Sequence, residues 1–315
     1  MKIKITSFKD MLNDYKTIDY TKYRDDVSKK LKSKFDECQS SIKLQEGILQ
    51  DFFEQYPCAL LGAISDVPQA HNVLGNLIIS QPRILDYTGD RKPDFVIVTR
   101  NSEQLFFNFI EIEDPSKKIF PANGKTALSS QFHDALSQLH QWQANENSMR
   151  ECCDHLLKTI FSDNFDVNRK TIHINYVLLY GDKSELSGTS SLKKAQFKES
   201  FFKPPFYHST YSRVMNNIYI PGGMFCVKRD AISDTYKAVG MVPFKNYGSS
   251  EWSDFHNITG KNHIILTDQY LDDADKQYLN KKIASMDTKS LSEVMQMQQA
   301  EPGTDVDDGI DELLN

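Results

Sequence analysis

Two stretches of the chain have the helical spacing of hydrophobic residues. Between Ile42 and Tyr56 the apolar residues recur every three or four positions, and Pro57 ends the pattern. This spacing predicts an amphipathic helix. Residues 125 to about 146 have a second apolar stripe with the same spacing, which predicts another amphipathic helix.

Other stretches are continuously rich in β-branched and aromatic residues, which is typical of buried strands. The strongest two, 94–99 and 105–113, flank a short polar segment, and together they predict a β-hairpin with its loop at 100–104. Residues 171–180 predict a further buried strand. Shorter strands, or approaches to strands, are expected at 73–79, 83–87 and 224–228.

The order helix, strands, helix, strand predicts the α/β class, with a mixed central sheet flanked by helices. The main domain is predicted at residues 42–232. We expect a small N-terminal helical element at 1–41 and a C-terminal extension at 233–300, with a helix beyond about Thr288. Residues 301–315 predict a disordered acidic tail.

The formal net charge of −6 is carried by this tail, which holds six acidic residues and no Lys or Arg, so residues 1–300 are formally neutral. The overall charge therefore neither supports nor excludes a nucleic-acid partner. No run of apolar residues approaches the roughly 20 that a membrane helix needs. We expect no membrane partner and a cytoplasmic location.

Five cysteines make an odd number, with no CxxC pair and no spacing typical of zinc sites. We expect reduced thiols. Cys152 and Cys153 are adjacent, and neighbours in a helix point in different directions, which favours packing over redox chemistry.

Two acidic residues end the second strand of the predicted hairpin. Because side chains alternate along a strand, Glu111 and Glu113 follow Phe109 on one face that is otherwise apolar. Asp94 begins the partner strand and comes level with them. Carboxylates that converge beside a core need a compensating cation, and oxygen ligands suit Mg²⁺, or Mn²⁺ in its place. The alternative is that these acids mark a strand end entering a solvated loop.

Polar residues on the two predicted helices extend this candidate site. Gln138 lies among apolar residues of the second helix, and a buried amide needs partners. It either caps a sheet edge or faces the carboxylates. Glu46 in the first helix is either a solvent residue or a fourth carboxylate directed at the metal.

Three segments together resemble a known family. The segments are Lys92-Pro93-Asp94-Phe95, then Phe109-Ile110-Glu111-Ile112-Glu113-Asp114-Pro115, then Gln138 to Trp142. In this order and spacing they resemble the nuclease domain of the Shedu anti-phage defence proteins. The resemblance covers roughly Leu44 to Met215 and includes the helical segment EGILQDFFEQYP.

The resemblance implies a PD-(D/E)xK restriction-endonuclease-like fold in which Asp94 and Glu111 hold Mg²⁺, helped by the carbonyl of Ile112. It also implies that Glu46 reaches the same site and that Gln138 positions a water or a ligand. The implied reaction is an in-line attack of metal-activated water on a DNA phosphodiester, in defence against phage. A homo-oligomer is also expected from the resemblance.

One residue departs from the family pattern, which usually ends in lysine where this chain has Glu113. Three interpretations stay open. Glu113 acts as general base or second-metal ligand, Lys117 or Lys118 supplies the missing cation, or the site is degenerate. The first is our working hypothesis, because a carboxylate beside a metal stays ionised and can accept a proton from bound water.

Lysines close to the acids predict contacts to the DNA backbone. One group follows the second strand and comprises Lys117, Lys118 and Lys125, and a second, at 193–203, includes Lys193 and Lys194. A solvated lysine-rich loop explains the second group equally well.

The leading hypothesis is therefore a metal-dependent DNA endonuclease. The alternative is a catalytically inactive nuclease fold that binds DNA ends or a partner. A third hypothesis makes the acidic tail an autoinhibitory DNA mimic that folds over the basic surface.

Overall fold

The structure is a computed structural model of the chain. It describes residues 19–41, 46–68, 72–84, 92–121, 128–161, 170–187, 197, 202–220, 224–230, 235–243 and 258–287.

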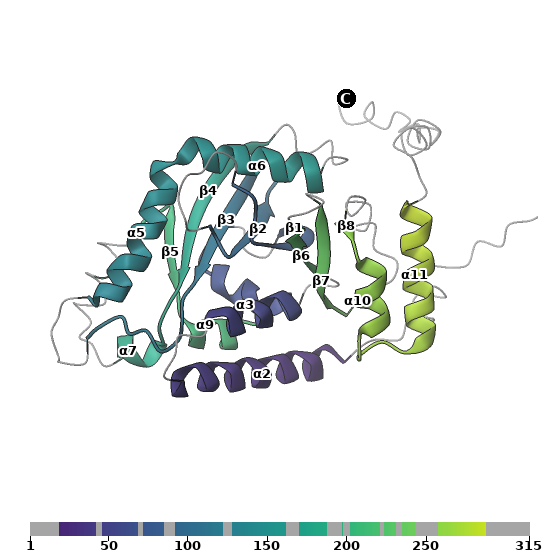
Figure 1. Cartoon of the computed structure of the whole chain (residues 1–315), viewed down its shortest axis with the longest axis horizontal. Helices are drawn as coiled ribbons and strands as arrows, with labels where there is room; N and C mark the ends of the chain where they lie inside the picture. The colour runs from purple at the N-terminus through teal and green to yellow at the C-terminus, as the bar shows by residue number, and fades with distance from the viewer. Residues whose placement is uncertain are drawn as a thin grey trace, which may run out of the picture.

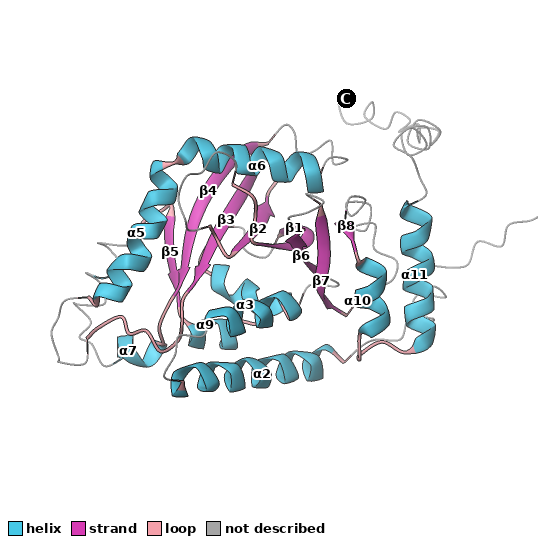
Figure 2. Ribbon diagram, viewed as in Figure 1, coloured by secondary structure: helices cyan, strands magenta, loops and turns pink. Residues whose placement is uncertain are grey.

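Among these residues, eight strands form one mixed sheet in the order β5-β4-β3-β2-β1-β6-β7-β8 (Figure 2). Strands β3, β4 and β5 are parallel to one another, while β2 is antiparallel to both of its neighbours. The predicted mixed sheet is confirmed. The strands are β1 (Val73–Ser80), β2 (Phe95–Arg100), β3 (Gln104–Ile112), β4 (Thr171–Leu179), β5 (Phe206–Ser209), β6 (Met224–Arg229), β7 (Tyr236–Val242) and β8 (Ile258–Thr259).

Helices pack on both faces of the sheet and enclose two cores. The larger helices are α2 (Tyr20–Ser40), α3 (Glu46–Gln55), α5 (Ser130–Ala144), α6 (Glu146–Ile160) and α11 (Asp273–Asp287). The shorter ones are α4 (Pro57–Leu60), η1 (Leu61–Ile64), α7 (Lys183–Ser187), α9 (Tyr211–Asn216) and α10 (Lys261–Thr267).

The two faces follow from the alternation of side chains along β3. Phe107 faces one core together with Leu139 of α5 and Leu156 of α6, and we call this side the α5 face. Ile110 faces the other core together with Phe53 of α3, and we call this the α2 face. The central strands are buried on both sides, which explains their nearly continuous apolar sequences.

The predicted hairpin is confirmed as β2 and β3. Its register pairs Phe95 with Ile110 and Arg100 with Leu105. The loop is closed by the Asn101 side-chain oxygen, which accepts hydrogen bonds from the backbone N–H groups of Glu103 at 2.9 Å and Gln104 at 2.7 Å. An asparagine that bonds its own following backbone is a common turn-forming device.

Several predicted elements differ in the structure. Residues 83 and 84 are not in a strand, and 85–87 lie outside the described residues. Pro57 ends α3 but also begins α4, because proline is well accommodated in the first turn of a helix. The helix predicted up to residue 146 ends at Ala144, and a second helix, α6, follows directly.

The predicted boundary at residue 232 falls between β6 and β7, which are antiparallel neighbours in the sheet. Strands β7 and β8, predicted as part of a C-terminal extension, therefore continue the same sheet. The helix predicted beyond Thr288 and the acidic tail at 301–315 lie outside the described residues.

The N-terminal element contains α2, which lies alongside α3 and α9 (Figure 1). Its buried residues recur every three or four positions, and the Asp19 side chain caps its first turn by accepting from the N–H of Lys22 at 3.0 Å. Near its end, the Phe35 ring lies 5.6 Å from the ring of Tyr211 in α9, and the Gln39 amide donates to the Pro115 carbonyl at 3.3 Å. None of the described helices is long and apolar enough to span a membrane.

Candidate active site

The start of β2 lies against the end of β3, and this brings Asp94 to Glu111. The Asp94 N–H donates to the Ile110 carbonyl at 3.1 Å, and the Asp94 carboxylate accepts from the Ile112 N–H at 2.8 Å. The Asp94 carboxylate is therefore within hydrogen-bond distance of the peptide that joins Glu111 to Ile112. In a strand the N–H and C=O of one residue point to the same side, so the Ile112 carbonyl is also directed to the side of Asp94.

Glu111 is bound by a residue of the opposing helix. The Gln138 amide donates to the Glu111 carboxylate at 2.6 Å, and the Gln138 side chain is almost completely buried. Helix α5 presents Gln138 on the same side as Leu139 and Trp142, which pack in the core of the α5 face. A hydrogen bond to a charged acceptor is roughly twice as strong as a neutral one. The buried amide thus fixes the carboxylate, which agrees with the interpretation that Gln138 faces the carboxylates.

Glu113 has a different partner from the one expected. Its carboxylate forms an ion pair with the Lys117 ammonium, and both side chains are largely buried, at 7% and 14% exposed. Its backbone is held on both sides, because its N–H donates to the Leu179 carbonyl at 3.1 Å and its carbonyl accepts from the Tyr211 hydroxyl. Burial raises the pKa of Tyr211 well above its usual value, so this hydroxyl stays protonated and acts as a donor.

The three predicted carboxylates do not form a three-acid metal cluster. Among the described residues, no group of three or more His, Cys, Asp or Glu side chains is placed to hold a metal ion. The predicted donors that remain within the described part of the chain are the carboxylates of Asp94 and Glu111 and the carbonyl of Ile112. This set still fits Mg²⁺, which keeps several waters and typically takes only one or two protein carboxylates.

The sequence of the chain matches one known protein family over the region of the site. The profile of the family described as Shedu protein SduA, C-terminal, matches residues 43–215, more than half of the chain. The chain belongs to this Shedu family. No curated protein matches it. Family membership indicates a role in anti-phage defence.

The region matched to the Shedu family contains the site but not all of the fold. It begins just before α3, includes Asp94, Glu111 and Gln138, and ends within α9. The match agrees with the extent of the resemblance that the sequence motifs predicted. Helix α2 and everything from β6 onward lie outside the matched region.

The structure describes the side chains of only some of the other predicted site residues. Glu46 is the first residue of α3, but its side chain lies outside the described part, as do Lys125, Lys193 and Lys194. Lys118 is exposed, and its carbonyl accepts from the Ser129 hydroxyl at 2.5 Å. Of the lysines predicted to contact DNA, Lys118 and Lys203 are both described and exposed, whereas Lys117 is largely buried against Glu113.

A buried polar network near Asp94 was not predicted. Glu54 of α3 is almost completely buried and forms an ion pair with Lys228 of β6 at 2.9 Å. Ser80 donates to the same carboxylate at 2.5 Å, and the next residue, Gln81, donates its N–H to the Asp94 carbonyl at 2.8 Å. The network therefore supports the backbone that carries Asp94. Its only signal in the sequence is an acid on the apolar side of a helix.

The cysteines are free and buried, as predicted. Burial raises the pKa of the Cys58 and Cys152 thiols to about 12, so both are protonated and unreactive at neutral pH.

Proposed function

We propose that the chain is a metal-dependent DNA endonuclease of the PD-(D/E)xK type, acting in anti-phage defence. The observation that carries the proposal is the contact between the Asp94 carboxylate and the peptide N–H of Ile112, directly beside a Glu111 that Gln138 holds from the opposing helix. Carboxylates from two adjacent strands, backed by a buried amide, form an arrangement suited to a divalent cation.

Asp94, Glu111 and the Ile112 carbonyl would hold Mg²⁺ or Mn²⁺. When bound, the metal supplies a water of lowered pKa and neutralises charge that develops on the phosphate. Gln138 fixes the orientation of the Glu111 carboxylate, so this side chain loses less conformational entropy when the metal binds. The exposed Lys118 would contact the DNA backbone. Assembly into a homo-oligomer is part of the proposal, and light scattering measures it.

A plasmid assay tests the activity. With Mg²⁺ or Mn²⁺, we expect the purified chain to convert supercoiled plasmid to nicked or linear DNA. Because the metal is required, excess EDTA is expected to abolish conversion, and re-added Mg²⁺ to restore it. Cleavage that continues undiminished in EDTA would refute metal dependence.

Lys117 provides the cation that position 113 lacks. Glu113 stands two positions after Glu111, where the family pattern has a lysine. The Lys117 ammonium forms an ion pair with the Glu113 carboxylate and so brings a positive charge to this position. We therefore revise the working hypothesis that Glu113 is the general base. In the revised proposal Glu113 orients Lys117, whose positive charge stabilises the developing charge of the reaction.

Charge reversal at this pair distinguishes the two roles. Lys117→Gln is expected to lower the cleavage rate about a hundredfold, in the range seen when one stabilising donor is removed. The double variant Glu113→Lys with Lys117→Glu keeps the ion pair and places the ammonium as in the family pattern, so it is expected to retain activity within about tenfold of wild type. Rates are measured in single-turnover cleavage.

The matched control is Lys118→Gln, which removes the exposed neighbouring charge and is expected to change the single-turnover rate less than Lys117→Gln does. Thermal melting of each variant is measured in parallel, because Lys117→Gln leaves a buried carboxylate without its cation. If the double variant folded well but were inactive, the result would contradict the revised proposal and support Glu113 as the general base.

The second candidate function is a catalytically inactive module that binds DNA ends or a partner. The ion pair with Lys117 favours it, because this pair removes Glu113 from the predicted metal ligands and leaves, among the described side chains, the carboxylates of Asp94 and Glu111. Calorimetric titration separates the two candidates. Divalent-metal binding that Asp94→Ala abolishes supports the nuclease, and the absence of binding at millimolar metal supports the inactive module.

A further inference from the structure

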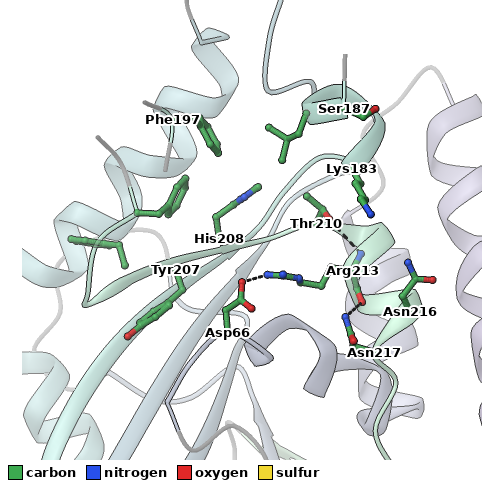
Figure 3. A pocket seen from close by; sticks show the side chains of 13 residues that line it. Asp66, Lys183, Ser187, Phe197, Tyr207, His208, Thr210, Arg213, Asn216 and Asn217 are labelled. Atoms are coloured by element: carbon green, nitrogen blue, oxygen red, sulfur yellow. Dashed lines mark hydrogen bonds and ion pairs between the residues drawn. The ribbon is translucent and has the colours of Figure 1, made fainter. Parts of the chain in front are cut away.

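A cavity of about 590 Å³ lies at the edge of the sheet, between β5, α7 and α9 (Figure 3). Cavities of this size accommodate small-molecule ligands. None of Asp94, Glu111, Glu113 or Gln138 lines it. The cavity is therefore distinct from the proposed nuclease site.

One side of the cavity offers flat aromatic surfaces. The rings of His208 and Phe202 lie 4.9 Å apart at an interplanar angle of 30°, and the Phe197 ring meets His208 nearly at a right angle, 5.4 Å away. The His208 Nε2 atom lies 3.0 Å from the Tyr180 carbonyl, which fixes the orientation of the imidazole. Ring edges and faces held in this way suit a planar aromatic ligand.

The other side is polar and carries net positive charge. Its charged residues among the described lining are Lys183, Arg213 and Asp66, which gives a formal charge of +1 when His208 is neutral. Arg213 pairs with Asp66 at a half-exposed position, where an ion pair contributes little energy and exchanges readily for a ligand. Lys183 has no ion pair within the described part of the chain. Arginine and lysine together favour a phosphate.

We propose that this cavity binds a nucleotide. The base packs against Phe202 and His208, and the phosphate lies at Lys183 and Arg213. The Asp66 carboxylate then accepts from a sugar hydroxyl or an exocyclic amine. A free nucleoside phosphate and the terminal nucleotide of a DNA strand present the same groups, so both are sources of this ligand.

The walls of the cavity are tied to the segment that follows β3. The Glu185 carboxylate of α7 accepts from the Ile119 N–H at 2.8 Å, and Ser212 of α9 donates to Asp182 beside α7. Tyr211, next to Ser212, donates to the Glu113 carbonyl. These hydrogen bonds connect the elements that line the cavity to residues 113–119, which include the Glu113–Lys117 pair.

Calorimetry of the full chain without divalent metal tests the proposal, since binding is then measured without cleavage. The probes are 5′-AMP, adenosine, inorganic phosphate and a single-stranded tetradeoxynucleotide. We expect 5′-AMP or the tetradeoxynucleotide to bind more tightly than adenosine or phosphate alone, because only these join base and phosphate. Tighter binding of 5′-AMP identifies a free nucleotide as the source, and tighter binding of the tetradeoxynucleotide identifies a strand end.

Two variants locate the binding. Lys183→Ala is expected to raise the dissociation constant about tenfold, because it removes a phosphate contact. Phe202→Leu is expected to raise it about tenfold, because it removes the flat ring while keeping apolar bulk. The matched control is Lys158→Ala, at an exposed lysine of α6 that does not line the cavity. Failure of both 5′-AMP and the tetradeoxynucleotide to bind at millimolar concentration, or binding unchanged in both variants, would overturn the proposal.

Discussion

Replacing Glu111 with glutamine is expected to slow DNA cleavage by about a thousandfold, which corresponds to about 4 kcal/mol of transition-state stabilisation. The variant removes one of the two described carboxylates that we propose as metal ligands. It keeps the shape of the side chain and an oxygen that can accept from the Gln138 amide. The fold is therefore expected to survive. Single-turnover cleavage and calorimetric Mg²⁺ binding measure the two effects.

The matched control is Glu103→Gln, at the opposite end of the same hairpin. Glu103 is exposed in the β2–β3 loop, and the same chemical change there is expected to leave the cleavage rate within about twofold. If Glu111→Gln cleaved DNA as fast as wild type, the proposed site would be wrong even if the chain cleaves DNA by another route.

The second large effect is expected from Phe35→Ala in α2. Phe35 is 6% exposed and packs beside the Tyr211 ring, so truncation leaves a cavity between α2 and α9. Substitution of a buried phenylalanine by alanine typically costs 3–5 kcal/mol, and we expect a loss of about 3 kcal/mol in the free energy of unfolding. Urea unfolding measures it.

Lys29→Ala is the control in the same helix, because Lys29 is exposed. Its free energy of unfolding is expected to stay within about 0.5 kcal/mol of wild type. Equal stability of Phe35→Ala and wild type would mean that α2 does not pack on the sheet as the structure has it.

The elements that the sequence predicted well are those with a strong local pattern. The β2–β3 hairpin has two aromatic and β-branched runs around a polar turn, and its register follows from the length of that turn. The bounds of helix α6 were not predicted, although Cys152 and Cys153 were expected in a helix and Cys152, Leu156 and Ile160 have helical spacing. It follows α5 at Asn145 with no glycine or proline between them, so a helix boundary had no strong signal. Strand β7 was missed although it follows β6 after a short connection, because Lys237 and Gly240 interrupt its run of strand-forming residues.

The site was predictable where alternation along a strand decides the geometry and not where a loop does. Asp94 and Glu111 meet because the hairpin register brings the two strand ends level. Glu113 follows the last residue of β3, so its partner is set by the turn that brings Lys117 back to it. The ion pair between Glu54 and Lys228 joins residues far apart in the chain, and no local pattern indicates such a contact.

The position of α2 limits which chimaeric proteins can be built from the segment shared with the family. This helix precedes the segment shared with the family, yet it covers Tyr211 and reaches the backbone at Pro115. A chimaera that joins residues 43–215 to a different N-terminal partner would leave an apolar patch bare beside the end of β3. The new N-terminal partner would need an element that packs on this patch. Residues 43–215 therefore cannot be transferred between proteins without such an element.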